Sequence, residues 1–258
     1  GIQKIDDILY MDEIDEPALS RYPEDAHVEF RNVSFAYNTT TILKEVSFTA
    51  NPGTITALVG PSGAGKSTIA MLAARFWDIQ DGEILIGNVP IKEIPTSVLM
   101  DNIALVFQDN MLFFDTIEEN IRMGNKTATF EDVKRAACAA QCHEFIEALP
   151  DGYQTLVGEG GTYLSGGEMQ RLALARAILK DAPVILLDEA TAFADPENEG
   201  KILEAFSHLI KGKTVLVIAH RLGTITNADH ILYLDKGMIT EKGTHEELLA
   251  LHGAYAHM

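Results

Sequence analysis

The sequence has few cysteines and no long apolar segment. Only two of its 258 residues are cysteine, Cys138 and Cys142, and neither has a His or Cys partner at the spacing of a zinc site. No run of about 18 apolar residues occurs, and the acidic N-terminus lacks the apolar core of a signal peptide. We therefore expect no zinc site and no membrane span in this sequence, and the composition fits a reducing cytoplasm.

Basic residues are also scarce. The sequence has 20 Lys and Arg against 38 Asp and Glu, which gives a net charge of −18. Nucleic-acid binding depends on basic surfaces, so this balance predicts that no nucleic acid is a partner. The 47% of apolar and 22% of charged residues are typical of a globular protein that buries a substantial interior.

A glycine-rich loop is the strongest local feature of the sequence. It reads Gly60-Pro61-Ser62-Gly63-Ala64-Gly65-Lys66-Ser67-Thr68. An apolar run at 55–59 precedes it and a breaker-free stretch at 69–76 follows, which is the strand–loop–helix context of a phosphate-binding P-loop. Backbone N–H groups and the helix N-terminus would bind an anion, Lys66 adds a full positive charge, and the Ser67 hydroxyl can hold Mg²⁺. The loop predicts nucleotide binding, but not what the nucleotide is used for.

The remaining pattern predicts an α/β fold. Apolar residues alternate from about 27 to 48, which indicates antiparallel strands. Short apolar runs without alternation indicate parallel strands covered on both faces, and they lie at 55–59, 103–107, 184–187 and 214–219. Helical signals fill most of a predicted insertion at about 109–170, and a further helix is expected from about Met169 to Lys180. Residues 2–11 predict a short helix, followed by an acidic linker to about Asp25.

Polar residues end three of these apolar runs. Asp188 and Glu189 follow one run, Gln108 follows another, and His220 follows a third. In open parallel sheets ligands bind at the carboxyl ends of the strands, so we expect these side chains beside the P-loop. Asp188 would reach Mg²⁺, and Glu189 could polarise an attacking water as a general base. Gln108 and His220 are expected to face the γ-phosphate.

A further motif, Leu164-Ser165-Gly166-Gly167-Glu168, precedes a predicted helix. It resembles the signature motif of the ATP-binding domain of ATP-binding cassette (ABC) transporters, and the resemblance extends over essentially the whole chain from Val28. It implies a P-loop NTPase (RecA-like) core over residues 26–258, with an N-terminal antiparallel β subdomain and an inserted α-helical subdomain. It also implies hydrolysis of ATP with Mg²⁺ in a head-to-tail dimer, in which each signature meets the γ-phosphate held by the P-loop of the second domain.

The resemblance assigns further roles to single residues. Tyr37 is similar to the aromatic residue that stacks on adenine, and Gln108 matches a residue that contacts Mg²⁺ and the attacking water. Asp195 matches an aspartate that communicates across the dimer, and His220 matches the switch histidine at the γ-phosphate. The predicted catalytic residues are Lys66, Gln108, Glu189 and His220. The predicted nucleotide-binding residues are Tyr37, the nine residues of the P-loop, Gln108, Ser165, Gly167, Glu168 and Asp195. The predicted metal ligands are Ser67, Gln108 and Asp188.

Two segments look like those of exporter-type members, Val157-Gly158-Glu159-Gly160-Gly161 and Glu241-Lys242-Gly243-Thr244-His245-Glu246-Glu247-Leu248. In that type the ATP-binding domain follows six membrane helices in one polypeptide. The resemblance therefore implies a transmembrane domain in the same full-length chain and a place on the cytoplasmic face of the membrane. Residues 1–25 would be the helix and linker that come from this preceding membrane domain.

The sequence departs from the family pattern at two places. Glu168 stands where Gln is commonest in the signature. The segment Thr191-Ala192-Phe193-Ala194-Asp195 differs from the commoner Ser, Ala, Leu before Asp, and it is similar to a subgroup that imports iron-siderophores on an exporter fold. Glu189, His220 and the signature are all present, so the chain does not resemble a degenerate half of an asymmetric pair.

The sequence gives less support to two other functions. Soluble members of the family act on DNA or ribosomes, but they carry long coiled-coil insertions or two cassettes, and the acidic composition disfavours them. A nucleotide-binding regulator that does not hydrolyse is disfavoured by Glu189 and His220. The transported substrate is not encoded in this chain, because membrane helices select it.

Overall fold

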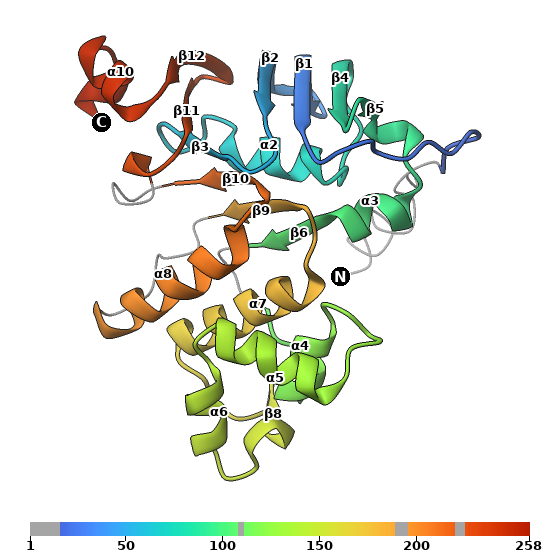
Figure 1. Cartoon of the computed structure of the whole chain (residues 1–258). Helices are drawn as coiled ribbons and strands as arrows, with labels where there is room; N and C mark the ends of the chain where they lie inside the picture. The colour runs from blue at the N-terminus through green and yellow to red at the C-terminus, as the bar shows by residue number, and fades with distance from the viewer. Residues whose placement is uncertain (1–15, 108–110, 189–195, 220–224) are drawn as a thin grey trace.

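The chain forms two stacked β-sheets with helices on the far face of the larger one (Figure 1). The computed structural model describes residues 16–107, 111–188, 196–219 and 225–258. None of the helices in these ranges has the length and apolarity that a membrane span requires. The predicted helix at 2–11 lies outside the described residues.

The smaller sheet is antiparallel and has the strand order β2-β1-β4-β5. Its strands are β1 (Val28–Tyr37), β2 (Thr40–Ala50), β4 (Asp81–Ile86) and β5 (Val89–Pro90). The alternation in the sequence produces this sheet, because one face of β1 and β2 packs into the interior while the other faces solvent. The predicted antiparallel β subdomain is confirmed.

The larger sheet has the order β12-β11-β3-β10-β9-β6, and only β12 runs antiparallel to its neighbour. Its strands are β3 (Ile55–Val59), β6 (Ile103–Val106), β9 (Val184–Asp188), β10 (Thr214–Ile218), β11 (His230–Asp235) and β12 (Met238–Gly243). Four of these strands are the predicted apolar runs, and the parallel core is confirmed. They are mainly apolar because both faces of the sheet are covered.

Two hydrophobic clusters cover the two faces of this sheet. On one face, Leu58 and Leu216 pack with the smaller sheet and with helix α2 (Lys66–Ala73). On the other face, Ala57 and Val217 pack with α7 (Gly166–Lys180) and α8 (Pro196–Ile210). Helices α2 and α7 therefore lie on opposite faces of the sheet, as Figure 1 shows.

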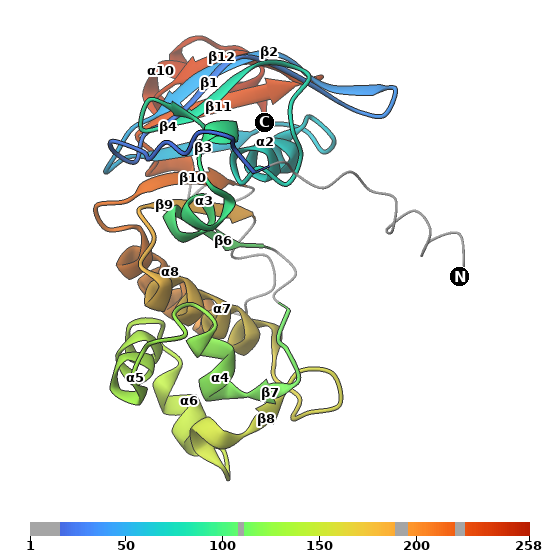
Figure 2. The same ribbon diagram turned by 90° about the vertical axis from the view of Figure 1, so that its right-hand side faces the viewer.

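A mainly helical segment lies between β6 and α7, at the bottom of Figures 1 and 2. It contains α4 (Ile117–Arg122), α5 (Phe130–Ala139) and α6 (His143–Ala148), the short strands β7 (Asp115–Thr116) and β8 (Leu156–Val157), and η2 (Gly152–Gln154). Its placement agrees with the inserted helical subdomain of the family. Helix α7 packs against α4 and α5 as well as against α8 and β6, so it joins this segment to the sheet. The boundaries 109–170 and 1–25 stay predictions.

Helix α7 begins earlier than the sequence predicted. The sequence predicted a start near Met169, whereas the first turn in the structure includes the poor helix formers Gly166 and Gly167. The structure starts the helix at Gly166, because Ser165 and Glu168 form a capping box around its first turn. The remaining elements of the described ranges are α3 (Thr96–Asn102), α10 (His245–Ala250), η1 (Ile91–Glu93) and η3 (Tyr255–His257).

The described part of the acidic linker, residues 16–25, has no helix or strand and lies along the smaller sheet. The N–H group of Arg21 donates to the carbonyl of Glu93 at 2.9 Å, and that of Glu24 donates to the carbonyl of Gly87 at 3.1 Å.

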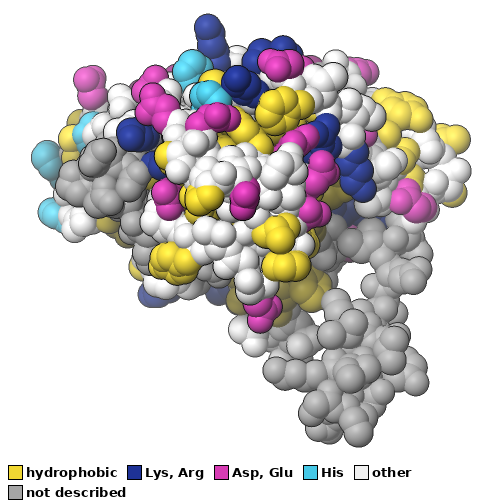
Figure 3. Space-filling model, turned by 90° about the horizontal axis from the view of Figure 1, so that it is seen from below, with side chains coloured by type: hydrophobic (Ala, Val, Ile, Leu, Met, Phe, Trp, Pro, Cys, Tyr) yellow, Lys and Arg dark blue, Asp and Glu magenta, His cyan; other side chains and the backbone are white. Residues whose placement is uncertain are grey.

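Figure 3 shows the distribution of charged side chains on the face of the molecule that is seen from below. Lys and Arg side chains are interspersed there with Asp and Glu rather than gathered into one basic surface. The absence of a nucleic-acid partner stays a prediction.

Candidate nucleotide-binding site

The P-loop connects the carboxyl end of β3 to the N-terminus of α2. Gly60, Gly63 and Gly65 have φ angles of 132°, 78° and 103°, which side-chain-bearing residues rarely adopt. Gly65 is the N-cap of α2 and supplies no side chain to bind the first N–H groups of the helix. The helix therefore begins with N–H donors that suit an anion.

Two of these glycines are also in close contact with neighbouring strands. A Cβ atom on Gly60 would lie 2.0 Å from the carbonyl oxygen of Leu234 in β11. A Cβ atom on Gly65 would lie 2.6 Å from the Leu43 side chain in β2. The loop is thus held between the two sheets, and only glycine allows this packing.

Lys66, the first residue of α2, is buried, with 6% of its surface exposed. Its Nζ donates to the carbonyl oxygens of Gly60 at 2.8 Å and Pro61 at 2.9 Å, so the ammonium group lies against the loop. Ser67 is exposed next to it and Thr68 is buried. A buried ammonium, free helix N–H groups and an exposed hydroxyl fit a phosphate chain with a cation.

The strand register places Asp188 at the same edge of the sheet as the P-loop. Asp188 lies opposite Ile218 of β10, and Ile218 lies opposite Leu58 of β3. The N–H group of Ala219 donates to the carbonyl of Leu58 at 3.1 Å, so β10 continues beside the start of the loop. Asp188 is half-buried at the end of its strand.

Four of the predicted site residues, Gln108, Glu189, Asp195 and His220, lie outside the described residues. The structure does show that β6, β9 and β10 end at Val106, Asp188 and Ile218, along one edge of the parallel sheet. Their predicted roles stay predictions.

Tyr37 ends β1 in an aromatic cluster. Its ring packs edge-on against Trp77 at a centroid distance of 5.3 Å and against Phe35 at 4.8 Å. Its hydroxyl lies 3.9 Å from the sulfur of Met71 in α2. Trp77, with 41% of its surface exposed, was not predicted as a site residue, and its position shortly after the P-loop helix was the available signal.

Ser165 is exposed at the N-terminus of α7. Because α7 and α2 cover opposite faces of the sheet, the signature motif and the P-loop belong to different faces of one chain. Among the described residues, which include Cys138 and Cys142, no group of three or more His, Cys, Asp and Glu side chains is arranged to hold a metal ion. Cys142 is buried, and this burial raises the pKa of its thiol.

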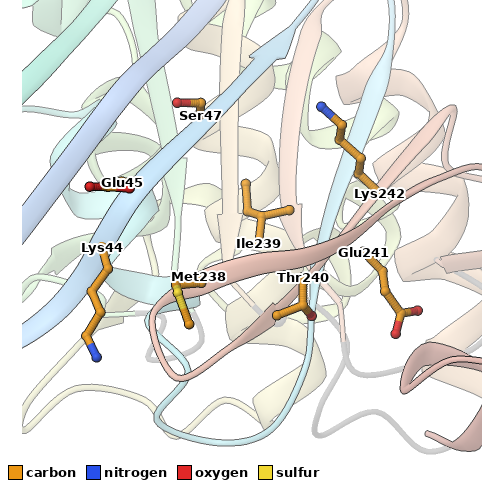
Figure 4. A pocket seen from close by; sticks show the side chains of 8 residues that line it. All are labelled: Lys44, Glu45, Ser47, Met238, Ile239, Thr240, Glu241 and Lys242. Carbon is orange, nitrogen blue, oxygen red and sulfur yellow. The ribbon is translucent and has the colours of Figure 1, made fainter.

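A separate groove of about 310 Å³ lies between the edges of the two sheets (Figure 4). Lys44, Glu45 and Ser47 come from β2, and Met238 and Thr240 are among the side chains that come from β12. No P-loop residue lines this groove.

The α/β fold and the glycine loop between β3 and α2 define a P-loop nucleotide-binding protein. The family model described as ABC transporter matches residues 43–192, and the chain belongs to this family. Proteins of this family bind ATP.

Relatives and a solved structure agree with this family. The chain is 47% identical over 242 residues to the ATP-dependent lipid A-core flippase of Desulfotalea psychrophila, with 93% of this chain and 42% of that protein aligned. It is 50% identical over 234 residues to the mycobactin import ATP-binding/permease protein IrtA of Mycobacterium tuberculosis, which covers 90% of this chain and 27% of that protein. A solved structure of a bacterial Atm1-family ABC exporter with ATP bound has a TM-score of 0.91 and 41% identity, over 99% of this chain and 45% of that one. The chain thus spans less than half the length of each of these proteins.

Proposed function

We propose that this chain is the ATP-hydrolysing motor domain of an exporter-type ABC transporter. The observation that carries the proposal is the P-loop, where strained glycines, an uncapped helix N-terminus and buried Lys66 meet at the edge that Asp188 shares. The identity of the chain to an ATP-dependent flippase and to an ATP-binding/permease protein also supports the proposal. The substrate stays unassigned, because the transport proteins above differ in what their names say they move.

Each residue would contribute a distinct part of phosphoryl transfer to water. The P-loop N–H groups and Lys66 would hold the β- and γ-phosphates and neutralise their charge. Ser67 and Asp188 offer oxygen ligands of the kind Mg²⁺ prefers, and Mg²⁺ would add further neutralisation of the phosphates. Glu189 would polarise the attacking water, and His220 would bind at the γ-phosphate.

The adenine of ATP would bind at Tyr37. The Tyr37 ring packs against Trp77 and lies near Met71 of the P-loop helix. The adenine could therefore stack on an aromatic surface next to the site of the phosphates. Gln108 would contact Mg²⁺ and the attacking water.

The working unit would be a head-to-tail pair. Ser165 and Gly167 lie at the start of a helix on the opposite face of the sheet from the P-loop helix. This placement supports a signature that serves the nucleotide of a second ATP-binding domain. Asp195 would communicate across this interface.

The membrane partner would contact an exposed apolar surface formed by Met111, Phe113 and Phe114, which have 72%, 51% and 62% of their surface exposed. Buried Asn120 holds this segment by bonds of 2.9 Å with both backbone groups of Phe113, and Arg176 of α7 donates to the carbonyl of Asn120 at 2.9 Å. Exposed apolar surface on a firm support is typical of an interaction site. We propose that this surface meets a transmembrane domain of the same polypeptide on the cytoplasmic face of the membrane. Residues 1–25 would be the helix and linker that come from this membrane domain.

The alternative of a soluble ATPase that acts on DNA or ribosomes has no support from the relatives above, whose names are those of a flippase and a permease.

The test is the substitution Glu189→Gln. Loss of a general base lowers turnover by roughly 10²–10⁴-fold, so ATP hydrolysis should nearly vanish while ATP binding persists. ATP should then trap a dimer, which sedimentation velocity would detect. The matched control is Glu204→Gln on the exposed face of α8, which removes the same charge and should leave turnover unchanged. Wild-type turnover in Glu189→Gln would remove the role assigned to this residue.

A further inference from the structure

Glu168 stands where Gln is commonest in the signature motif, and its carboxylate binds Ser165. The Oε2 atom of Glu168 accepts from the backbone N–H of Ser165 at 2.8 Å and from the Ser165 hydroxyl at 2.9 Å. In return, the Ser165 Oγ atom accepts from the N–H of Glu168 at 3.3 Å. Both residues are thus bound to each other through three hydrogen bonds at the start of α7.

This arrangement occupies the one hydrogen that the Ser165 hydroxyl can donate. A hydrogen bond to a carboxylate is charge-assisted and is stronger than the bond to the neutral amide oxygen that Gln would offer. Ser165 is exposed, so a phosphate can approach it, but its hydroxyl can donate to that phosphate only after it leaves Glu168. The capped state therefore competes with phosphate binding.

Electrostatic repulsion from Glu168 also opposes the binding of a phosphate at Ser165. A phosphate bound to Ser165 would lie within a few ångströms of the Glu168 carboxylate, and like charges at that distance repel strongly when water is excluded. Glu168 also stands in a chain with a net charge of −18, so no general positive field offsets it.

We infer that Glu168 is a positioning residue that holds the Ser165 hydroxyl away from nucleotide and so raises the ATP concentration at which the pair closes. The inference rests on the proposed function, since it concerns the ATP held by the partner's P-loop. It narrows the sequence prediction for Glu168, because the carboxylate acts on the nucleotide through Ser165 rather than as a direct ligand.

The chain contains a matched control for this residue. Thr244 and Glu247 form the same kind of capping box at the start of α10, where Glu247 Oε2 accepts from the Thr244 N–H at 2.8 Å and the Glu247 N–H donates to Thr244 Oγ1 at 3.3 Å. Glu247→Gln removes the same charge from the same position of a capping box outside the signature motif.

The experiment measures the ATP concentration for half-maximal dimer formation by the chain in the Glu189→Gln background. Glu168→Gln should lower this concentration about 3- to 10-fold, and Glu247→Gln should change it by less than twofold. The shift should shrink at high salt, which screens charge. In the hydrolysing protein, Glu168→Gln should lower the KM for ATP, and Glu247→Gln should leave the KM unchanged.

A second background tests whether Glu168 acts through Ser165. In Ser165→Ala no hydroxyl is left to release, so Glu168→Gln should produce a clearly smaller shift than it does beside serine. An equal shift in both backgrounds, or an unchanged or higher ATP requirement in Glu168→Gln, would overturn the positioning role while ATP still drives dimerisation. If no variant dimerises with ATP, the proposed pair fails and this inference fails with it.

Discussion

At the scale of single residues, two glycines of the P-loop have positive φ in very different surroundings. Gly60 is packed against the backbone of Leu234, whereas nothing lies within 4 Å of the position a Cβ would take on Gly63. The first glycine is needed for space and for backbone conformation, and the second for conformation alone.

This difference predicts unequal costs for substitution by alanine. Gly60→Ala adds both strain and a backbone clash, so its free energy of unfolding should fall by about 2–5 kcal/mol. Gly63→Ala should cost about 1 kcal/mol, because only the conformational strain applies. Urea denaturation of both variants gives the comparison. Equal losses would show that β11 does not constrain the loop.

The sequence predicted the backbone of the P-loop well, because a motif fixes the local geometry there. The P-loop forms between β3 and α2 as expected, because glycine conformations and the helix start are local properties. Trp77 was missed, because its contact with Tyr37 joins residues 40 positions apart through packing that no periodicity records. The loop residues Gln108, Glu189 and His220 stay predictions.

At the scale of secondary-structure elements, helix α5 shows how local signals set a helix start. Asp132 Oδ2 accepts from the Thr129 N–H at 2.8 Å and from its hydroxyl at 2.6 Å, and Thr129 caps the N–H of Asp132. These bonds from Thr129 hold the pKa of Asp132 below its ordinary value. Arg135 also pairs with this carboxylate.

The lowered pKa predicts a pH-dependent contribution to stability. A carboxyl group whose folded-state pKa is depressed contributes fully above its unfolded pKa of about 4, and the contribution is lost as the pH falls through the folded value. Asp132→Asn should therefore lower the free energy of unfolding at neutral pH, and the difference from wild type should narrow as the pH falls below about 4.

Urea denaturation across this pH range measures the effect of Asp132→Asn. Glu131→Gln, which removes a charge from the same helical turn outside the capping box, should produce a smaller change. A difference that stays constant at acid pH would contradict the lowered pKa.

Elements were predicted unequally from the sequence. Helical signals indicated the segment that contains α5, and apolar runs located the parallel strands, because these signals lie within a few residues of each other. Strands β11 and β12 were not predicted, because they pair through positions set by the rest of the sheet and β12 is half-exposed along its whole length.

At the scale of the whole molecule, the exposed apolar surface of Met111, Phe113 and Phe114 lies outside both hydrophobic clusters. Phe114→Ser should change the free energy of unfolding by less than about 0.5 kcal/mol, since the side chain is mostly exposed. It should reduce the binding of a hydrophobic dye, measured by fluorescence.

Leu251→Ser is the control for this surface, because Leu251 is 63% exposed and belongs to neither cluster. It should reduce dye binding less, as a single exposed apolar side chain does not form a patch. An equal reduction in both variants would argue against a specific surface around Phe114.

The length of α7 has a mechanical consequence. Its 15 residues run from Gly166, next to the N-cap Ser165 of the signature, to Lys180, four residues before β9, whose last residue is Asp188. A helix of this length is a rigid rod of about 22 Å, so a tilt of about 10° displaces its far end by roughly 4 Å. That displacement exceeds a hydrogen-bond length, so small rotations at the sheet would make or break contacts at the signature. In the proposed pair, α7 would thus couple the nucleotide bound at the chain's own P-loop to the contacts that its signature makes with the partner's nucleotide.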